Sequence, residues 1–365
     1  MKKINTAPIS GMQELLPREQ AIFDQIKSQI MQVYHLHGFN HIETPMIDRT
    51  EILLAKAGGD TEKQIYKVVK TAETSDDADQ ALRFDHTVPL ARYVVEHQND
   101  LAFPFRVSQF GRNFRGERAQ KGRFREFYQM DADIIGRNTL PIGYDAEVVA
   151  TAFHALSQFV KTPILVRLSN RKILAGLLEA LALTEKSSEI YGIIDHAEKV
   201  PAEVTETKLR EQVAEESKVQ TLLQFVQIRG PRAEVAEKLV ALGIENETFM
   251  TGVSELLLVL DLLEAQGIGQ SVIADMLIIR GLDYYTGTVF ETLLPEYKNL
   301  GSICSGGRYD NLASNYTEEK FPGVGISIGL TRLFYCLSAN NLLEKYLNSF
   351  LYLRFVPLQK LLHLY

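Results

Sequence analysis

A short segment of the chain carries an unusual concentration of positive charge. Seven basic side chains lie between residues 106 and 125, opposed by one acidic side chain, Glu117. The basic residues are Arg106, Arg112, Arg115, Arg118, Lys121, Arg123 and Arg125. The segment has a net charge of +6 (seven minus one) in a chain whose net charge is −7. Guanidinium groups bind phosphate oxygens in pairs, so the cluster suits a polyanion such as a nucleoside triphosphate. The alternative is a solvated basic hairpin, or one that contacts RNA.

The next residues, RFREFYQMDADII (123–135), predict a strand with two different faces. Side chains alternate between faces along a strand. One face is mostly apolar and carries Phe124, Glu126, Tyr128, Met130, Ala132 and Ile134. The other carries Arg123, Arg125, Phe127, Gln129, Asp131 and Asp133. This polar face runs from cations to carboxylates, which fits a ligand with phosphates at one end and an amine at the other. Phe127 is placed to stack on a flat base. The alternative is an exposed sheet face with scattered charges.

Two further segments present phenols beside charged groups. RGLDYYTGTVFE (280–291) combines the guanidinium of Arg280 with the adjacent phenols of Tyr284 and Tyr285. CSGGRYDNL (304–312) brings a third phenol, Tyr309, after two glycines. Taken separately, the tyrosine pair could be a cross-strand aromatic pair in a core, and the glycines could form a turn.

These segments together resemble the histidyl-tRNA synthetases, which are class II aminoacyl-tRNA synthetases. Five segments match motifs of that family, in the family's order, over roughly residues 8–340. They are GFNHIETPMID (38–48, motif 1), FRGERAQKGRFREFYQMDADIIG (114–136, motif 2), RGLDYYTGTVFE and CSGGRYDNL (the two histidine-specific signatures) and GVGISIGLTRL (323–333, motif 3). Five ordered matches make the resemblance far more specific than any single motif.

The resemblance implies roles for five residues in binding ATP. Arg115 would contact the α-phosphate, with Glu117 nearby in the motif 2 loop. Arg123 would reach the outer phosphates, and Arg332 would lie on the γ-phosphate side. Phe127 would stack on adenine. Mg²⁺ is expected on the outer phosphates, and no metal site formed by the protein alone is expected.

The resemblance also implies a binding site for histidine. Its residues would be Asp85, Thr87, Gln129, Asp133, Arg280, Tyr284, Tyr285 and Tyr309. The ammonium group of histidine would pair with a carboxylate such as that of Asp85, and its carboxylate would pair with Arg280 or Gln129. A neutral imidazole has one donor and one acceptor, so a phenol and a carboxylate can read both nitrogens.

The implied activity is histidine–tRNA ligation in two steps, with Arg115 and Arg280 as the catalytic residues. Histidine and ATP would form histidyl-adenylate, and tRNA(His) would accept the histidyl group at its 3′ end. A homodimer built partly through motif 1 is expected. The alternative is the histidine-sensing regulatory subunit of ATP phosphoribosyltransferase, a non-catalytic paralogue. In that protein the motifs have typically lost the catalytic arginines. Arg115, Arg280 and Arg332 are all present here, which favours the enzyme. Two positions depart from the family pattern: Ala119 stands where proline is usual and Thr331 where glutamate is common.

The elements that must hold these residues predict an α+β fold. The resemblance implies a class II catalytic fold, an antiparallel sheet of six or seven strands flanked by helices. We expect a discontinuous core (1–168 and 251–340), a helical insertion (169–250) and an atypical tail (341–365) with no anticodon-binding domain. Helical spacing predicts a helix over 18–37 that ends at Gly38. We further expect a strand over 39–48 that Pro45 interrupts, which indicates an edge strand or an unusual pairing. We also expect a helix with Thr87 as its N-cap, and strands over 277–291 and 302–305.

Composition bounds the remaining possibilities. Of the 365 residues, 45% are hydrophobic and 23% charged, which is ordinary for a soluble protein of about two domains. The chain contains no run of eighteen apolar residues and no apolar core of a signal peptide, so we expect no membrane segment. With only Cys304 and Cys336, a disulfide framework is not expected, and the cytoplasm is the default location. The tail, rich in leucine and aromatics, suggests a shortened or frameshifted reading frame, or else a divergent terminal helix.

Overall fold

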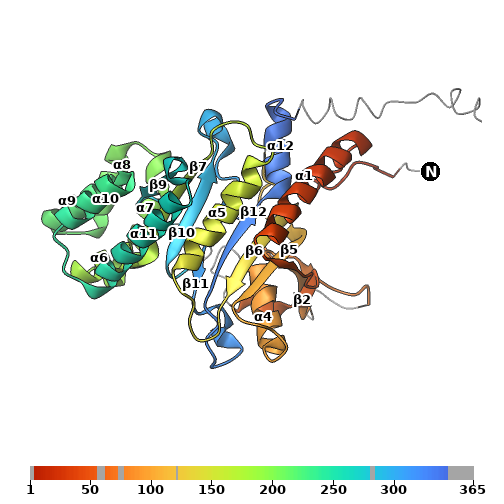
Figure 1. The fold of residues 1–365 in the computed structure, drawn as a ribbon, viewed down its shortest axis with the longest axis horizontal. Coiled ribbons are helices and arrows are strands. Elements are labelled where there is room, and N and C mark those ends of the chain that lie inside the picture. The colour runs from red at the N-terminus through yellow and green to blue at the C-terminus, as the bar shows by residue number, and fades with distance from the viewer. Residues whose placement is uncertain (1–3, 56–61, 73–77, 121, 280–283, 344–365) are drawn as a thin grey trace, which may run out of the picture.

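Figure 1 shows a computed structural model of the chain, which describes residues 4–55, 62–72, 78–120, 122–279 and 284–343. The fold is α+β: a large twisted sheet carries helices on one face, and a group of helices lies beside one end of the sheet. Within the described residues, every helix is too short or too polar to span a bilayer.

The large sheet has nine strands in the order β1-β5-β6-β12-β11-β10-β7-β9-β8. Their bounds are β1 Asn40–His41, β5 Phe105–Phe114, β6 Glu126–Ile135, β7 Leu165–Asn170, β8 Arg229–Gly230, β9 Val272–Asp275, β10 Thr288–Leu293, β11 Cys304–Tyr309 and β12 Gly323–Ile328. The six strands from β5 to β7 in this order pair antiparallel, as the family resemblance implied. β1 and β9 extend this unit as parallel neighbours of β5 and β7. A separate three-stranded sheet consists of β2 Ile47–Arg49, β4 Gln80–Leu82 and β3 Lys67–Val68.

The helices fall into two groups. The first packs on the two sheets: α1 Pro17–Leu36, α2 Thr50–Leu54, α4 Thr87–His97, α5 Gly143–Ser157 and α12 Leu330–Ala339. Of these, α2 packs against α4 and the small sheet. The second lies beyond β7: α6 Arg171–Ala180, α7 Ser187–His196, α8 Ala202–Gln212, α9 Glu216–Val226, α10 Arg232–Ala241 and α11 Glu247–Ala265. This second group corresponds to the helices predicted after residue 171.

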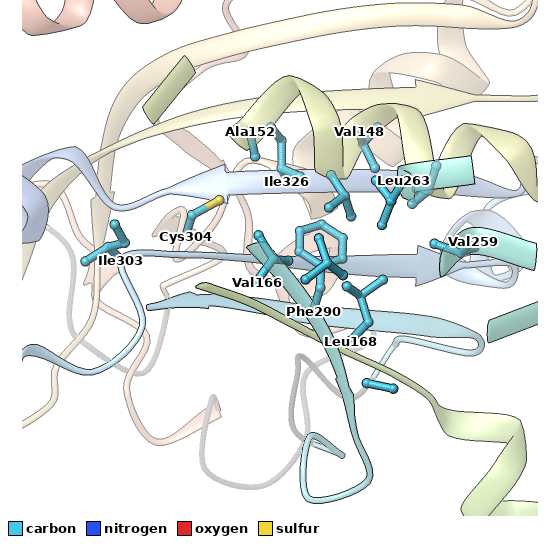
Figure 2. Packing of buried hydrophobic residues seen from close by; sticks show 14 of the residues in the cluster. Val148, Ala152, Val166, Leu168, Val259, Leu263, Phe290, Ile303, Cys304 and Ile326 are labelled. Carbon is cyan, nitrogen blue, oxygen red and sulfur yellow. The ribbon is translucent and has the colours of Figure 1, made fainter. Parts of the chain in front are cut away.

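The main core lies between the sheet and the helices α1, α5, α11 and α12. Met130, Ala132 and Ile134 of β6 are fully buried there, so the apolar face predicted for this strand is its core face. Figure 2 shows another part of this core, where helix and strand residues meet around Phe290 of β10. Its labelled neighbours include Val148, Ala152, Val166, Leu168, Val259, Leu263 and Ile326. The opposite face carries mostly polar side chains, except at the end where α4 packs on Phe105, Val107 and Ile135.

The interruption predicted at Pro45 is present, because β1 and β2 belong to different sheets and Pro45, which cannot donate to a strand ladder, lies between them. Two other local predictions were wrong. Thr87 is the first residue of α4 and not its N-cap. The carboxylate of Asp85 supplies the capping interaction, accepting a 3.1 Å hydrogen bond from the Val88 amide.

The strand predicted over residues 277–291 is present only from Thr288 onward, as β10, and its predicted start at Leu277 was wrong; residues 280–283 lie outside the described residues. β9 ends at Asp275 and β10 begins at Thr288, with a turn after β9 that the Asp275 carboxylate stabilises by accepting from the Leu277 amide. By contrast, the strand predicted over 302–305 is present as β11, and it continues to Tyr309. CSGGRY is therefore a strand and not the glycine turn that was the alternative.

Candidate active site

Two adjoining cavities lie on the polar face of the large sheet. One has a volume of about 370 Å³ and the other about 330 Å³. Five residues line both: Arg115, Arg123, Gln129, Ser305 and Ser327. Because the cavities share this boundary, a ligand in one would meet a ligand in the other beside Gln129.

The first cavity, which we call the arginine cavity, is lined by Arg115, Glu117, Arg123, Phe127 and Arg332. The Arg115 guanidinium lies 5.1 Å from the centre of the Phe127 ring, and its Nε donates to the carbonyl of Phe84. Arg123 donates a 3.2 Å hydrogen bond to the Glu117 carboxylate. A flat aromatic surface therefore lies beside three cations.

Arg332 is held at the N-terminal end of α12. It donates to the carbonyl of Leu300, while its Nε is buried without a hydrogen-bond partner among the described residues. Burial lowers the pKa of Arg332, and the nearby cation Arg123 lowers it further. Both effects disfavour the charged form, and an anion in the cavity would relieve them.

The basic cluster of residues 106–125 is split between the two faces of the sheet. Arg115 and Arg123 line the cavities, whereas Arg106 and Arg112 extend from the core face of β5 and form ion pairs with Glu147 and Glu126. The expectation that the whole cluster faces one polyanion was wrong for these two arginines. Lys121 lies outside the described residues.

The second cavity, which we call the carboxylate cavity, contains three aspartates and three tyrosines. These residues are Asp85, Asp131, Asp133, Tyr284, Tyr285 and Tyr309. The Tyr284 hydroxyl donates to Asp85 Oδ2 at 3.1 Å, and the Tyr309 hydroxyl donates to Asp133 Oδ1 at 2.8 Å. The Tyr284 ring meets Tyr285 and Tyr309 edge to face, at centroid distances of 5.1 and 6.0 Å.

The electrostatics of the carboxylate cavity favour a cationic ligand. Burial raises the pKa of Asp85. Burial raises the pKa of Asp133 well above its usual range, and the negative charge of the neighbouring Asp131 raises it further. Burial also raises the pKa values of the tyrosines, so the phenols keep their protons and donate. A ligand with an ammonium or another N–H donor would offset the cost of these buried carboxylates.

Two glycines of β12 make room for these side chains. A Cβ on Gly325 would lie 1.9 Å from Asp133 Oδ1, and one on Gly323 would lie 2.3 Å from the Tyr309 ring. The carboxylate and the ring can lie over β12 because these positions have no side chain. The glycines in GVGISIG therefore shape the cavity.

The structure brings the predicted site residues together in two groups. Arg115, Glu117, Arg123, Phe127 and Arg332, predicted for ATP, line the arginine cavity. Asp85, Thr87, Gln129, Asp133, Tyr284, Tyr285 and Tyr309, predicted for histidine, line the carboxylate cavity. Arg280 lies outside the described residues.

Sequence reasoning missed a polar network beneath the cavities. Asp131 accepts from Ser327 at 2.6 Å, and its other oxygen lies 3.0 Å from Nδ1 of His86, which is fully buried. The alternation of β6 placed Asp131 on the polar face, so a signal for it existed. His86 gave none, because its partner lies 45 residues away in the chain.

Comparison with known proteins gives a consistent result. The family model described as "Histidyl-tRNA synthetase" matches residues 11–333. The histidine–tRNA ligase of Clostridium tetani (strain Massachusetts / E88) is 46% identical over 340 residues, covering 92% of this chain and 76% of that protein. The ligase of Clostridium acetobutylicum is 45% identical, covering 95% of this chain and 79% of that protein.

Solved structures agree. The crystal structure of histidyl-tRNA synthetase from Nostoc sp. PCC 7120 is similar with a TM-score of 0.82 and 38% identity, covering 93% of this chain and 77% of that one. A structure from Bacillus halodurans C, titled as an ATP phosphoribosyltransferase regulatory subunit/histidyl-tRNA synthetase, has a TM-score of 0.80 at 24% identity and covers 92% of this chain and 84% of that one. At that identity the second comparison shows a shared fold alone.

Proposed function

The chain belongs to the histidyl-tRNA synthetase family, and from this we propose that it activates histidine with ATP and transfers it to the 3′ end of tRNA(His). Membership makes it an aminoacyl-tRNA synthetase. The observation that carries the proposal is the pair of adjoining cavities, one with cations beside an aromatic ring and one with carboxylates beside phenols. Their shared boundary is where the carboxylate of an amino acid would meet the α-phosphate of a nucleotide.

In the first step, the histidine carboxylate attacks the α-phosphorus of ATP and pyrophosphate leaves. Catalysis of such a step consists mostly of positioning the reactants and neutralising the developing charge. We propose that Arg115 and Arg280 supply this charge from opposite sides of the α-phosphate. Arg123 and Arg332 would bind the outer phosphates, and Phe127 would stack on adenine.

The carboxylate cavity would recognise histidine through both of its nitrogen-containing groups. Asp85 would accept from the ammonium, with Thr87 beside it. Asp133 would accept from the imidazole N–H, and the Tyr309 hydroxyl, which donates to Asp133 in the absence of ligand, would turn its hydrogen to the other imidazole nitrogen. Tyr284 and Tyr285 would enclose the ring. A site that pairs buried polar groups rejects analogues lacking them by roughly 10⁴-fold or more.

In the second step, the 3′-terminal hydroxyl of tRNA(His) attacks the carbonyl carbon of the adenylate and AMP leaves. The nucleophile is a substrate oxygen, so the reaction needs no nucleophilic side chain. The shared boundary of the cavities carries the side chains of Gln129, Ser305 and Ser327 around the position proposed for that carbonyl.

Mg²⁺ accompanies ATP in this proposal. The described part of the chain holds no group of three or more histidine, cysteine or acidic side chains arranged to bind a metal. Mg²⁺ at nucleotide sites is commonly held by substrate phosphates, water and only one or two protein carboxylates. Glu117 and Glu291, which line the cavities, would supply those oxygens, and the ion would neutralise phosphate charge when bound.

The regulatory paralogue is the weaker alternative. It would share the fold and a histidine cavity with the enzyme, so these two features do not distinguish them. A protein that only senses histidine does not need an arginine cavity next to it. Here Arg115, Arg123 and Arg332 line such a cavity together with Phe127.

Histidine-dependent exchange of pyrophosphate into ATP tests the first step. We expect exchange with histidine and none with glutamine or phenylalanine, and loss of exchange in Arg280→Ala and Arg115→Ala with folding retained by circular dichroism. Charging of tRNA(His) with labelled histidine tests the second step. Binding of histidine without any exchange would contradict the enzyme and support the regulator.

We propose the same discontinuous organisation that the sequence predicts, with a core of residues 1–168 and 251–340, an insertion of 169–250 and a homodimeric assembly in the cytoplasm. The tail from residue 344 lies outside the described residues. Light scattering on the purified chain would check the dimer, because a monomeric mass would exclude it.

A further inference from the structure

A chain of hydrogen-bonded side chains runs beneath the boundary between the two cavities. Asn113 Nδ2 of β5 donates to Gln129 Oε1 at 2.6 Å, and Gln129 Nε2 of β6 donates to Ser327 Oγ of β12. Ser327 Oγ donates in turn to Asp131 Oδ1 at 2.6 Å. Asp131 Oδ2 lies 3.0 Å from His86 Nδ1. Asn113, Asp131 and His86 are almost completely buried.

The carboxylate of Asp131 sets the direction of this chain. An ionised carboxylate only accepts hydrogen bonds, so Ser327 must use its single hydrogen for Asp131. The Ser327 oxygen can then only accept from Gln129, and only the nitrogen of that amide can donate. The Gln129 amide nitrogen is thereby fixed on the Ser327 side and its oxygen on the Asn113 side.

The opposite direction would be available without the carboxylate. Asn113 Oδ1 is buried and has no hydrogen-bond partner among the described residues. If Asn113 and Gln129 both turned over, this oxygen would accept from Gln129 Nε2, and Ser327 could donate to Gln129 Oε1. An amide has both a donor and an acceptor end, so the two arrangements differ little unless a neighbour accepts only. Asp131 is that neighbour.

We infer that Asp131, acting through Ser327, is a positioning residue that makes Gln129 present an N–H group to the histidine carboxylate. Gln129 lines both cavities, and its nitrogen lies on the side of Ser327, at their shared boundary. One N–H of the amide is used by Ser327, which leaves the second for an anionic ligand. This inference rests on the proposed function, because it assumes that the carboxylate of histidine lies at this boundary.

Binding of histidine compared with histidinol tests the inference. Histidinol keeps the imidazole and the amine but has a hydroxymethyl group in place of the carboxylate. Ser327→Ala breaks the chain without changing the charge of the cavity. We expect its Kd for histidine to rise about tenfold, the factor that corresponds to roughly 1.4 kcal/mol, with the Kd for histidinol unchanged. Ser327→Thr keeps the hydroxyl and should keep the wild-type ratio of the two Kd values.

Asp131→Asn adds a second measurement of the same ratio. The substitution removes one negative charge, which weakens the binding of histidine and of histidinol alike. It also allows the hydrogen bonds to run in the opposite direction, which weakens the binding of histidine alone. The Kd ratio should therefore change as in Ser327→Ala, and the double variant should show no larger change, because both substitutions interrupt one chain. Ser169→Ala, in β7 and outside both cavities, is the matched control and should keep the wild-type ratio.

Three outcomes would overturn the inference: an unchanged ratio in Ser327→Ala, an unchanged ratio in Asp131→Asn, or independent effects that multiply in the double variant. Failure of the proposed function is distinguishable, because the wild-type chain would then not bind histidine or would catalyse no exchange.

Discussion

The Tyr309 hydroxyl of β11 donates a 2.8 Å hydrogen bond to Asp133 Oδ1 of β6, although β12 lies between these two strands. The bond can form because β12 carries Gly323 opposite Tyr309 and Gly325 opposite Asp133. Both side chains lean over the glycines toward each other. The wall of the carboxylate cavity thus depends on two positions that contribute no side chain.

Gly325→Ala should disable histidine binding. The added Cβ would lie 1.9 Å from Asp133 Oδ1, so the carboxylate must move and its bond to Tyr309 must break. A displacement of about 1 Å at a reacting site can cost on the order of 10²-fold in rate. We expect a loss of that size in histidine-dependent pyrophosphate exchange, with ATP binding retained. Gly192→Ala is the control, because a Cβ there has nothing within 4 Å. Wild-type exchange activity in Gly325→Ala would show that histidine binding does not depend on the position of the Asp133 carboxylate.

Asp133→Asn should stabilise the ligand-free protein at neutral pH. Burial and the neighbouring Asp131 raise the pKa of Asp133 well above its usual range. A carboxyl whose pKa is raised by folding contributes stability below its unfolded pKa, about 3.9, and loses that contribution as pH rises through the folded pKa. The difference in unfolding free energy between variant and wild type should therefore grow with pH above the ordinary aspartate range.

Thermal denaturation at several pH values measures this difference. The same experiment with added histidine should raise the melting temperature of the wild type and not that of Asp133→Asn. Asp100→Asn, which alters an exposed carboxyl, is the control. A difference that stays constant or shrinks as pH rises would contradict the raised pKa.

Arg308 should anchor β11 to α5. It is 5% exposed and binds Asp145, which is fully buried, through three hydrogen bonds of 2.6 to 3.1 Å, and it also donates to the Leu140 carbonyl. Removing one partner of a buried ion pair leaves an uncompensated charge and costs about 3–5 kcal/mol. We expect Arg308→Met to lower the free energy of unfolding in urea by that amount. The double variant Arg308→Met, Asp145→Leu should recover part of it, and if it is less stable than the single variant, the charge argument is wrong.

The sequence predicted the parts of the site that lie on one regular element. β6 alternates between Met130, Ala132 and Ile134 on the core face and Gln129 and Asp133 on the cavity face, so a period of two residues was enough. Other features depend on contacts between distant segments, which no local pattern contains. His86 depends on Asp131, and the space above Gly325 depends on the neighbouring strand.

Thr331 links two elements of the proposed ATP site at a position where the family commonly has glutamate. β12 pairs with β6 only as far as the Ile328–Met130 pair, so the backbone of β6 beyond that point has no strand on this side. The Thr331 hydroxyl takes that place and accepts a 2.7 Å hydrogen bond from the Tyr128 amide. Tyr128 lies between Phe127 and Gln129, and Thr331 precedes Arg332, so we expect this bond to help position Phe127 relative to Arg332.

Thr331→Val should therefore weaken ATP binding more than histidine binding. Valine has the same shape but no acceptor, and leaving this part-buried amide unpaired costs on the order of 1 kcal/mol. We expect the KM for ATP in pyrophosphate exchange to rise about tenfold, with a smaller change for histidine. Thr331→Ser keeps the hydroxyl and should keep the wild-type KM for ATP. Equal increases in both KM values for Thr331→Val would indicate that the bond supports the fold as a whole and does not position the ATP site.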